Sequence, residues 1–258
     1  MPKNYRVLVT NDDGIHSPGL TVAEDIARAI CDDVWVVAPE SEQSGASHSL
    51  TLSAPLRMRK MDERHYAVSG TPTDCVMMGC LHLLKDKMPN LIISGVNWGS
   101  NMADDVTYSG TIAGAMEGCA LGIPSIALSQ AYDESSRLQI DWSAGAAHGA
   151  DVVRRLVEAG WPAGTLMNVN FPACPAAQVK GTMVVPQGKY DLQSTEIEER
   201  HDARQRAYYW IGLRRRRATP PENTDLGAVY ADKIAVTPLH LNLTELSVLE
   251  TLRARLGK

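Results

Sequence analysis

The sequence predicts an α/β protein with a mostly parallel sheet, helices on both faces of that sheet, and a C-terminal β-hairpin extension. Short apolar runs alternate with stretches of helical apolar spacing over roughly the first two-thirds of the chain. The apolar runs are nearly continuous, which is typical of strands buried on both faces. From about residue 179 the pattern changes to longer polar-flanked segments, which favour hairpins over further strand–helix–strand units.

The first unit fixes the pattern that later units repeat. An apolar run at residues 5–10 predicts a strand, apolar residues at helical spacing predict a helix over 19–31, and residues 34–38 predict a buried parallel strand. Further cycles follow in the same order. Helices are expected at 73–84, 110–121 and 142–160, and strands at 91–94, 125–129 and 166–170.

Two regions depart from this alternation. Short strand-like pieces at 56–59 and 66–69 predict an antiparallel excursion beside the cleft. Near the C-terminus, a hairpin is expected within 184–217, followed by a strand at 235–238 and a helix at 243–256. No repeat or low-complexity linker divides the chain, so we expect a single domain with a catalytic core at 1–183 and a C-terminal extension at 184–258.

Composition limits the class of protein. The chain has 258 residues, of which 44% are hydrophobic, enough for a full core. A formal net charge of -5 argues against general binding to nucleic acid or to an anionic membrane, and no apolar run is long enough to span a bilayer. No classical signal peptide is recognisable. The cysteines are five in number with no Cys-x-x-Cys pair, which favours reduced thiols in a cytoplasmic protein: Cys31, Cys75, Cys80, Cys119 and Cys174.

Polar residues follow the first strand directly, in the segment Asn11, Asp12, Asp13 and Gly14. In an open α/β sheet, ligands bind outside the carboxyl ends of the strands, so two adjacent carboxylates there suggest a metal site. The alternative is ordinary turn chemistry, in which Asn and Asp side chains bond the nearby backbone. The loops at 39–49 and 95–101 would converge on the same edge. Carboxylate, hydroxyl and carboxamide oxygens suit Mg²⁺ or Mn²⁺ rather than zinc.

A second candidate feature is the start of the helix at 110–121, which Ser109, Gly110 and Thr111 open. Backbone N–H groups, hydroxyls and the positive end of the helix dipole could bind a phosphate there. The alternative is that Ser109 only caps a helix whose glycines allow close packing. No P-loop sequence is present, which argues against a P-loop kinase or ATPase.

Several blocks in this sequence resemble the SurE survival-protein family. They are Val-Thr-Asn-Asp-Asp-Gly-Ile-His-Ser-Pro-Gly at 9–19, Gln-Ser-Gly-Ala-Ser-His-Ser-Leu-Thr at 43–51, Gly-Thr-Pro-Thr-Asp-Cys-Val at 70–76, Ser-Gly-Val-Asn-Trp-Gly-Ser-Asn at 94–101 and Asp-Asp-Val-Thr-Tyr-Ser-Gly-Thr at 104–111. Shorter matches lie at 168–170, 208–212 and 236–239. The resemblance spans nearly the whole chain in the same order.

This resemblance implies a Rossmann-like core and a cytoplasmic phosphomonoesterase that depends on a divalent metal. The implied activity is a 5′-nucleotidase that also acts on 3′-nucleotides, with a Mg²⁺ or Mn²⁺ ion in each subunit. The resemblance also implies that the hairpin region at 184–217 is exchanged between subunits, giving homodimers or homotetramers. The implied metal ligands are Asp12, Asp13, Ser44 and Asn97, with Asn11 beside them, and the implied phosphate-binding groups are Asn101, Ser109, Gly110 and Thr111.

Several roles stay open at this level. The group that takes a proton from water could be an oxygen of Asp12 or Asp13, and an aspartyl-phosphate intermediate is an alternative. His16 and His48 could donate a proton to the leaving group or be structural. Trp98 could be a wall for a nucleobase or could pack in the core or an interface.

Tyr108 has the same two interpretations as Trp98. The arginine run at 214–217 is expected to be a solvated or acid-paired face, with contact to a polyanionic substrate as the alternative. The rival to the hydrolase interpretation as a whole is a non-catalytic nucleotide or phosphate sensor that acts through oligomer contacts.

Overall fold

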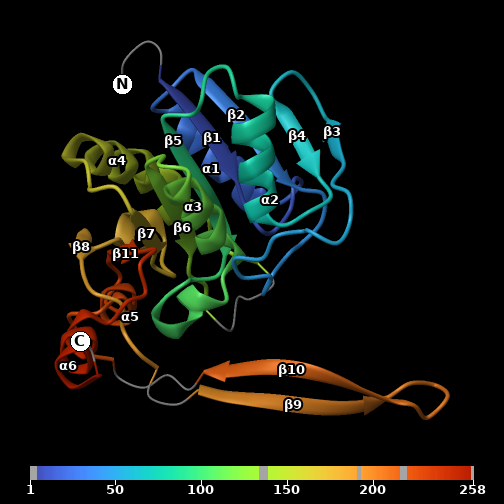
Figure 1. The fold of residues 1–258 in the computed structure, drawn as a ribbon, viewed down its shortest axis with the longest axis vertical. Helices are drawn as coiled ribbons and strands as arrows, with labels where there is room; N and C mark the ends of the chain where they lie inside the picture. Colours follow the sequence, from blue (N-terminus) through green and yellow to red (C-terminus); the bar gives the residue numbers. More distant parts are fainter. Residues whose placement is uncertain (1–4, 134–138, 191–192, 216–219, 257–258) are drawn as a thin grey trace.

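The central sheet confirms the predicted α/β fold. The computed structural model describes residues 5–133, 139–190, 193–215 and 220–256, and within these nine strands form one sheet in the order β3-β4-β2-β1-β5-β6-β7-β11-β8 (Figure 1). Its middle strands, from β4 to β7, are parallel to one another. Their bounds are Arg6–Thr10 for β1, Asp33–Pro39 for β2, His65–Val68 for β4, Leu91–Trp98 for β5, Ser125–Gln130 for β6 and Thr165–Phe171 for β7.

Both edges of the sheet carry short or antiparallel additions. The excursion predicted at 56–69 contains one antiparallel pair, between β3 (Met58–Lys60) and β4, while β4 itself runs parallel to β2. On the far side, β11 (Ile234–His240) lies antiparallel to β7, and β8 (Thr182–Val184) is parallel to β11. The C-terminal strand therefore completes the main sheet.

Helices cover both faces of the sheet, and the alternation of side chains along β1 shows how. Val7 and Val9 pack with α1 (Pro18–Arg28) and α4 (Ser143–Ala159) on one face. Leu8 points to the opposite face, where it packs with α2 (Pro72–Met77). The next helix on that face is α3 (Gly110–Ala120), whose Ile112 packs against Ala127 of β6. The strands between the helices are buried on both faces, as their continuous apolar runs predict.

Several predicted elements differ from the structure in their bounds. The helix expected at 73–84 ends as α-helix at Met77 and continues as a π-helix over Met78–Leu83, where Gly79 comes so close to Leu8 that an added Cβ would lie 3.0 Å from its Cδ2. The strand expected at 91–94 continues to Trp98 through a break in register between Ser94 and Asn97. The segment 184–190 is strand only at its first residue, and the short helix α5 (Asp225–Tyr230) was not predicted.

The C-terminal hairpin is present and projects away from the main body (Figure 1). β9 (Gln193–His201) pairs antiparallel with β10 (Ala207–Arg215). The arginine run lies partly at the end of β10 and partly at 216–217, outside the described residues, so its role stays a prediction. The last helix, α6, covers Leu246–Leu256 rather than 243–256. The division of the chain at residue 183 also stays a prediction.

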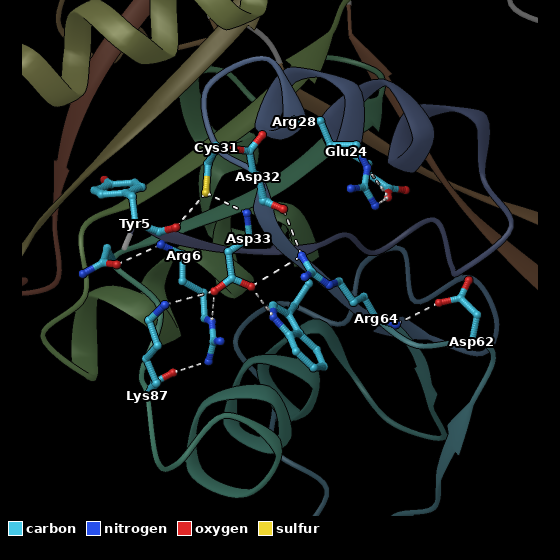
Figure 2. A network of polar contacts seen from close by, with 12 residues as sticks. Tyr5, Arg6, Glu24, Arg28, Cys31, Asp32, Asp33, Asp62, Arg64 and Lys87 are labelled. Carbon is cyan, nitrogen blue, oxygen red and sulfur yellow. Dashed lines mark hydrogen bonds and ion pairs between the residues drawn. The ribbon is translucent and has the colours of Figure 1, made fainter. Parts of the chain in front are cut away.

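A polar network at the amino ends of β1 and β2 ties the framework together (Figure 2). The carboxylate of Asp33 accepts hydrogen bonds from Arg6 Nε at 2.8 Å, Trp35 Nε1 at 2.9 Å and Lys87 Nζ at 3.1 Å. Burial disfavours the charge of Asp33, but these donors outweigh it and hold its pKa below the usual value. The network joins β1 and β2 to the loop before β5.

Two further findings concern cysteines and membranes. All five cysteines lie within the described residues, where they are buried and unpaired. In the part of the chain that the structure describes, no helix has both the length and the apolar character needed to cross a bilayer.

Candidate metal and phosphate site

The candidate site lies where the strand order changes direction. β1 has β2 on one side and β5 on the other, so a crevice opens beyond the carboxyl ends of β1 and β5. Asp13, which follows β1, accepts a hydrogen bond from the backbone N–H of Trp98 at the end of β5, at 3.0 Å. The carbonyl of Asp12 accepts one from the N–H of Gln43 in the loop after β2, at 2.8 Å. Three loops therefore meet at this point.

Asp12 is the buried member of the carboxylate pair, with 4% of its surface exposed. Thr111 donates its hydroxyl hydrogen to Asp12 Oδ1 at 2.5 Å. Gly110 must lack a side chain, because a Cβ there would lie 2.8 Å from the Cβ of Asp12. Burial raises the pKa of Asp12, and the hydrogen bond from Thr111 opposes this. The start of α3 thus packs directly on the first carboxylate.

Asp13 is half-buried and faces a cleft. Burial, and then the charge of Asp12, raise the pKa of Asp13 to about 7. The side-chain oxygen of Asn11 is also buried without a hydrogen-bond partner among the described residues. A buried and a half-buried carboxylate beside an unpartnered carbonyl oxygen form a donor set that a hard divalent cation would satisfy. The described residues contain no cluster of three or more His, Cys, Asp or Glu arranged for a metal, so neutral oxygens would have to complete the coordination.

The cleft has a volume of about 720 Å³, and Asp13 and Ser44 both line it. Ser44 donates its hydroxyl hydrogen to Glu42 Oε1 at 2.8 Å. This leaves the lone pairs of Ser44 Oγ available to a cation. Glu42 also lines the cleft, and its negative charge contributes to the raised pKa of Asp13.

Two asparagines, Asn97 near the end of β5 and Asn101 in the segment after it, differ in the atoms that they can offer to a ligand. Asn97 donates from Nδ2 to the carbonyl of Gly99 at 2.9 Å. Because this bond uses the amide nitrogen, the side-chain oxygen is the atom of Asn97 that could bind a metal. Asn101 is buried and donates from Nδ2 to Ser129 Oγ at 2.8 Å. Its backbone N–H donates to the side-chain oxygen of Asn170 at 2.8 Å. Asn101 is therefore held by a side-chain network that engages one of its two Nδ2 hydrogens.

At the start of α3, Ser109 caps the helix, because its Oγ accepts a hydrogen bond from the N–H of Ile112 at 3.1 Å. This is the capping role that the sequence allowed as an alternative to phosphate binding. This cap uses the N–H of Ile112 only, and the N–H groups of Gly110 and Thr111 in the same first turn would serve an anion, so both functions can coexist.

Comparison with known proteins decides the family. A family model described as "Survival protein SurE" matches residues 7–194. A protein of Parvibaculum lavamentivorans named 5′-nucleotidase SurE is 53% identical over 255 residues, which cover 99% of this chain and 92% of that protein. The chain belongs to the SurE family. A relative with the same name from Methylobacterium sp. (strain 4-46) is 54% identical over 98% of this chain and 100% of its own length.

Solved structures agree with this assignment to the SurE family. The crystal structure of the SurE protein from Aquifex aeolicus superposes with a TM-score of 0.82 at 39% identity, covering 96% of this chain and 98% of that one. The predicted Rossmann-like fold is thereby confirmed.

The histidine and aromatic candidates of this SurE family member differ in whether they line the cleft. His16 and Trp98 line the cleft, whereas Tyr108 is not among its lining residues. His48 lies 3.0 Å from the Glu117 carboxylate of α3, measured from Nε2 to Oε2, which favours a structural role. Sequence reasoning did not single out Tyr132, which also lines the cleft.

Glu42 was likewise not singled out. The available signal was its position two residues before Ser44, in a loop already expected at the site. The buried Asn168, quoted only as part of the family resemblance, donates from Nδ2 to the carbonyl of Asn101 at 2.7 Å.

Proposed function

We propose that this SurE family member is a divalent-metal-dependent phosphomonoesterase that hydrolyses nucleoside 5′-monophosphates, and also 3′-monophosphates, to nucleoside and phosphate. One observation carries the proposal: Asp13 opens into the cleft beside the buried Asp12, at the switch point of the sheet. The relatives named 5′-nucleotidase, at more than half sequence identity, support this choice of reaction.

The metal ligands proposed are Asp12, Asp13, Ser44 and Asn97, holding a single Mg²⁺ or Mn²⁺ ion. The hard oxygen donors and the raised pKa of both carboxylates fit such an ion. When bound, a divalent cation supplies neutralisation of phosphate charge and a lowered pKa for water.

The protein's own residues then divide the remaining work. Ser109, Gly110 and Thr111 at the start of α3, together with Asn101, are proposed to bind the phosphate and to stabilise the charge that develops on its oxygens. Asn11 donates from Nδ2 to the carbonyl of Gly14 at 3.0 Å and so holds the turn that presents the carboxylates.

Proton removal from water is assigned to Asp13. Asp13 lines the cleft, whereas Asp12 is almost fully buried behind it and accepts a hydrogen bond from Thr111. Direct attack by an aspartate on phosphorus is the competing route. Rapid-quench trapping of a phosphorylated protein, with retention of configuration at phosphorus, would support that route. Inversion of configuration without such a species would support direct attack by water, the step in which Asp13 would be the base.

Phosphate release tests the function itself. Purified protein should release phosphate from AMP in the presence of Mg²⁺ or Mn²⁺, and a chelator should abolish the release reversibly. The panel should include 3′-AMP, deoxynucleotides and short polyphosphate, because these separate the possible substrate classes. Binding of nucleotides without phosphate release from any nucleoside monophosphate would leave the protein as a nucleotide sensor.

Assembly and location complete the proposal. We infer that the β9–β10 hairpin joins subunits into a homodimer or homotetramer, because it projects from the body and leaves Trp210 59% and Ile211 73% exposed. Light scattering coupled to gel filtration would give the subunit number, and deletion of the hairpin should lower it.

Free buried cysteines support a cytoplasmic location.

A further inference from the structure

An exposed tryptophan stands at the rim of the catalytic cleft. Trp98 is 41% exposed and lines the cleft together with Asp13. Its backbone N–H donates to Asp13 Oδ2 at 3.0 Å, which fixes the position of its main chain relative to the carboxylates. This hydrogen bond uses the main chain alone, so any non-proline residue at this position would make it.

The ring of Trp98 is supported from behind. Trp142, at the N-terminal end of α4, meets it edge-on, with ring centroids 6.4 Å apart and ring planes at 88°. Trp142 is itself pressed against the start of α1, where a Cβ on Gly19 would lie 2.9 Å from its Cη2 atom. A ring held in this way presents its exposed surface with little loss of conformational freedom when a ligand binds.

A second aromatic ring belongs to the same cleft. Tyr132 lines it and lies against the backbone of Gly99, where an added Cβ would be 3.3 Å from Tyr132 Cε1. The N–H of Gly99 donates to the carbonyl of Gln130 at 3.0 Å, which joins the loop after β5 to the end of β6. Tyr132 lies two residues after the end of β6, so both aromatic residues come from adjacent strand ends.

We propose that Trp98 is a stacking platform for the base of the nucleotide, with Tyr132 as a second aromatic wall, and that the enzyme therefore prefers purine nucleoside monophosphates. This inference rests on the proposed function, since it assigns the base-binding part of the same cleft. A flat aromatic surface stacks on any base, and a purine offers the larger surface.

The charges around the cleft support a neutral aromatic ligand at this place. Its lining carboxylates are Asp13, Glu40 and Glu42, and none of the described residues that line it is Lys or Arg. A phosphate would therefore bind at the metal and the helix start rather than at this rim. The cleft volume of about 720 Å³ also falls within the range of about 300–1,000 Å³ that is usual for small-molecule sites.

The test compares AMP, UMP and ribose 5-phosphate, which share a phosphate ester and differ in the base. Wild-type protein should hydrolyse AMP with a KM about tenfold lower than for ribose 5-phosphate, with UMP between them. Trp98→Ala should remove most of this difference by raising the KM for AMP about tenfold, with little change in kcat or in the KM for ribose 5-phosphate. Trp98→Phe should retain most of the preference.

Tyr108→Ala is the matched control, because Tyr108 is also an exposed aromatic residue, at 54%, and does not line the cleft. It should leave the ratio of the two KM values unchanged. Equal KM values for AMP and ribose 5-phosphate in the wild type would overturn the platform while leaving the phosphatase function intact. An equal loss on both substrates in Trp98→Ala would also overturn it, since Trp98 would then act on the catalytic groups.

If the wild type hydrolyses neither compound, the proposed function fails and the platform is decided by binding. Calorimetry should then show AMP binding to the wild type about tenfold more tightly than to Trp98→Ala. Equal affinities would refute the platform. Circular dichroism of each variant verifies that it is folded.

Discussion

Gly110→Ala tests whether the contact between α3 and Asp12 is essential for catalysis. The added Cβ would lie 2.8 Å from the Cβ of Asp12 and 3.0 Å from its Oδ2. Carbon atoms in contact prefer separations of about 3.5–4.0 Å, so the two must separate by about 1 Å. Asp12 is buried and Thr111 donates to it from the same turn, so both groups would be displaced together.

A misplacement of about 1 Å in a catalytic group costs on the order of 100-fold in rate, and we expect kcat for AMP to fall by about that factor. Overpacking destabilises a core by about 1–3 kcal/mol, and the better helix propensity of alanine offsets about 1 kcal/mol of this. The variant should therefore stay folded at room temperature. Steady-state phosphate release at saturating Mg²⁺ measures the rate, and thermal unfolding followed by circular dichroism measures the fold.

Gly145→Ala is a suitable control, because it places alanine in the first turn of α4, with its nearest neighbours at 3.4 Å. It should change kcat by less than about twofold. A Gly110→Ala protein whose kcat stays within about threefold of wild type would refute the reasoning, because Asp12 would then tolerate displacement.

Three further changes probe the site and the framework. Asp13→Asn should lower kcat at least about 100-fold with the melting temperature preserved, and near-normal phosphate release would contradict its role as a ligand. Glu42→Ala removes the acceptor of the Ser44 hydroxyl and should weaken Mn²⁺ binding about tenfold by calorimetry. Glu40→Ala is the control, because the Glu40 carboxylate pairs with Arg59 at 3.6 Å. Equal Mn²⁺ affinities in the two variants would contradict a specific role of Glu42 in holding Ser44.

The last of these three changes concerns pH. Burial opposes the charge of His65, but hydrogen bonds to Glu24 and Asp62 outweigh it and raise the pKa of His65. Glu24 also pairs with Arg28. The stabilisation of the folded protein by protonated His65 is complete below the pKa of the unfolded state, about 6.5. It is lost as the pH rises through the higher pKa of the folded state. The free energy of unfolding in urea should decrease over this pH range by more in the wild type than in His65→Gln. If the two proteins show parallel pH profiles, the contacts of His65 with Glu24 and Asp62 are not the source of the decrease.

The sequence could locate the carboxylate pair because the relevant information is local. Asp12 and Asp13 directly follow an apolar strand, and the general rule for open α/β sheets places such residues at the binding edge. Glu42 and Tyr132 were not found in this way, because their roles depend on which loops meet across the cleft. Turn-like loops of this kind contain many polar residues, and periodicity does not distinguish those that face a cleft.

The type of most helices and strands could be predicted from the sequence, but the direction of β11 could not. The strand pattern at 235–238 is the same whether the strand runs parallel or antiparallel, and only pairing with β7 decides the direction of β11. The π-helical end of the second helix contains Gly79, which approaches Leu8 closely, and the periodicity of the sequence contains no sign of this contact between two distant positions. Element type was therefore readable from the chain, whereas direction and helix distortion depend on tertiary contacts.

Two aspartates at opposite ends of neighbouring strands show why one end of the sheet is framework and the other is a site. Asp33 has Arg6, Lys87 and the Trp35 indole as donors, and its pKa is lowered. Asp13, in contrast, receives its described hydrogen bond from a backbone N–H and lies beside another carboxylate, and its pKa is raised to about 7. The protein therefore stabilises the aspartate anion at the amino end of β2 and destabilises it after the carboxyl end of β1. A cation from solution would stabilise the second carboxylate more than the first. The fold places that carboxylate at the switch point of the sheet, where the segments that follow β1 and β2 meet the end of β5.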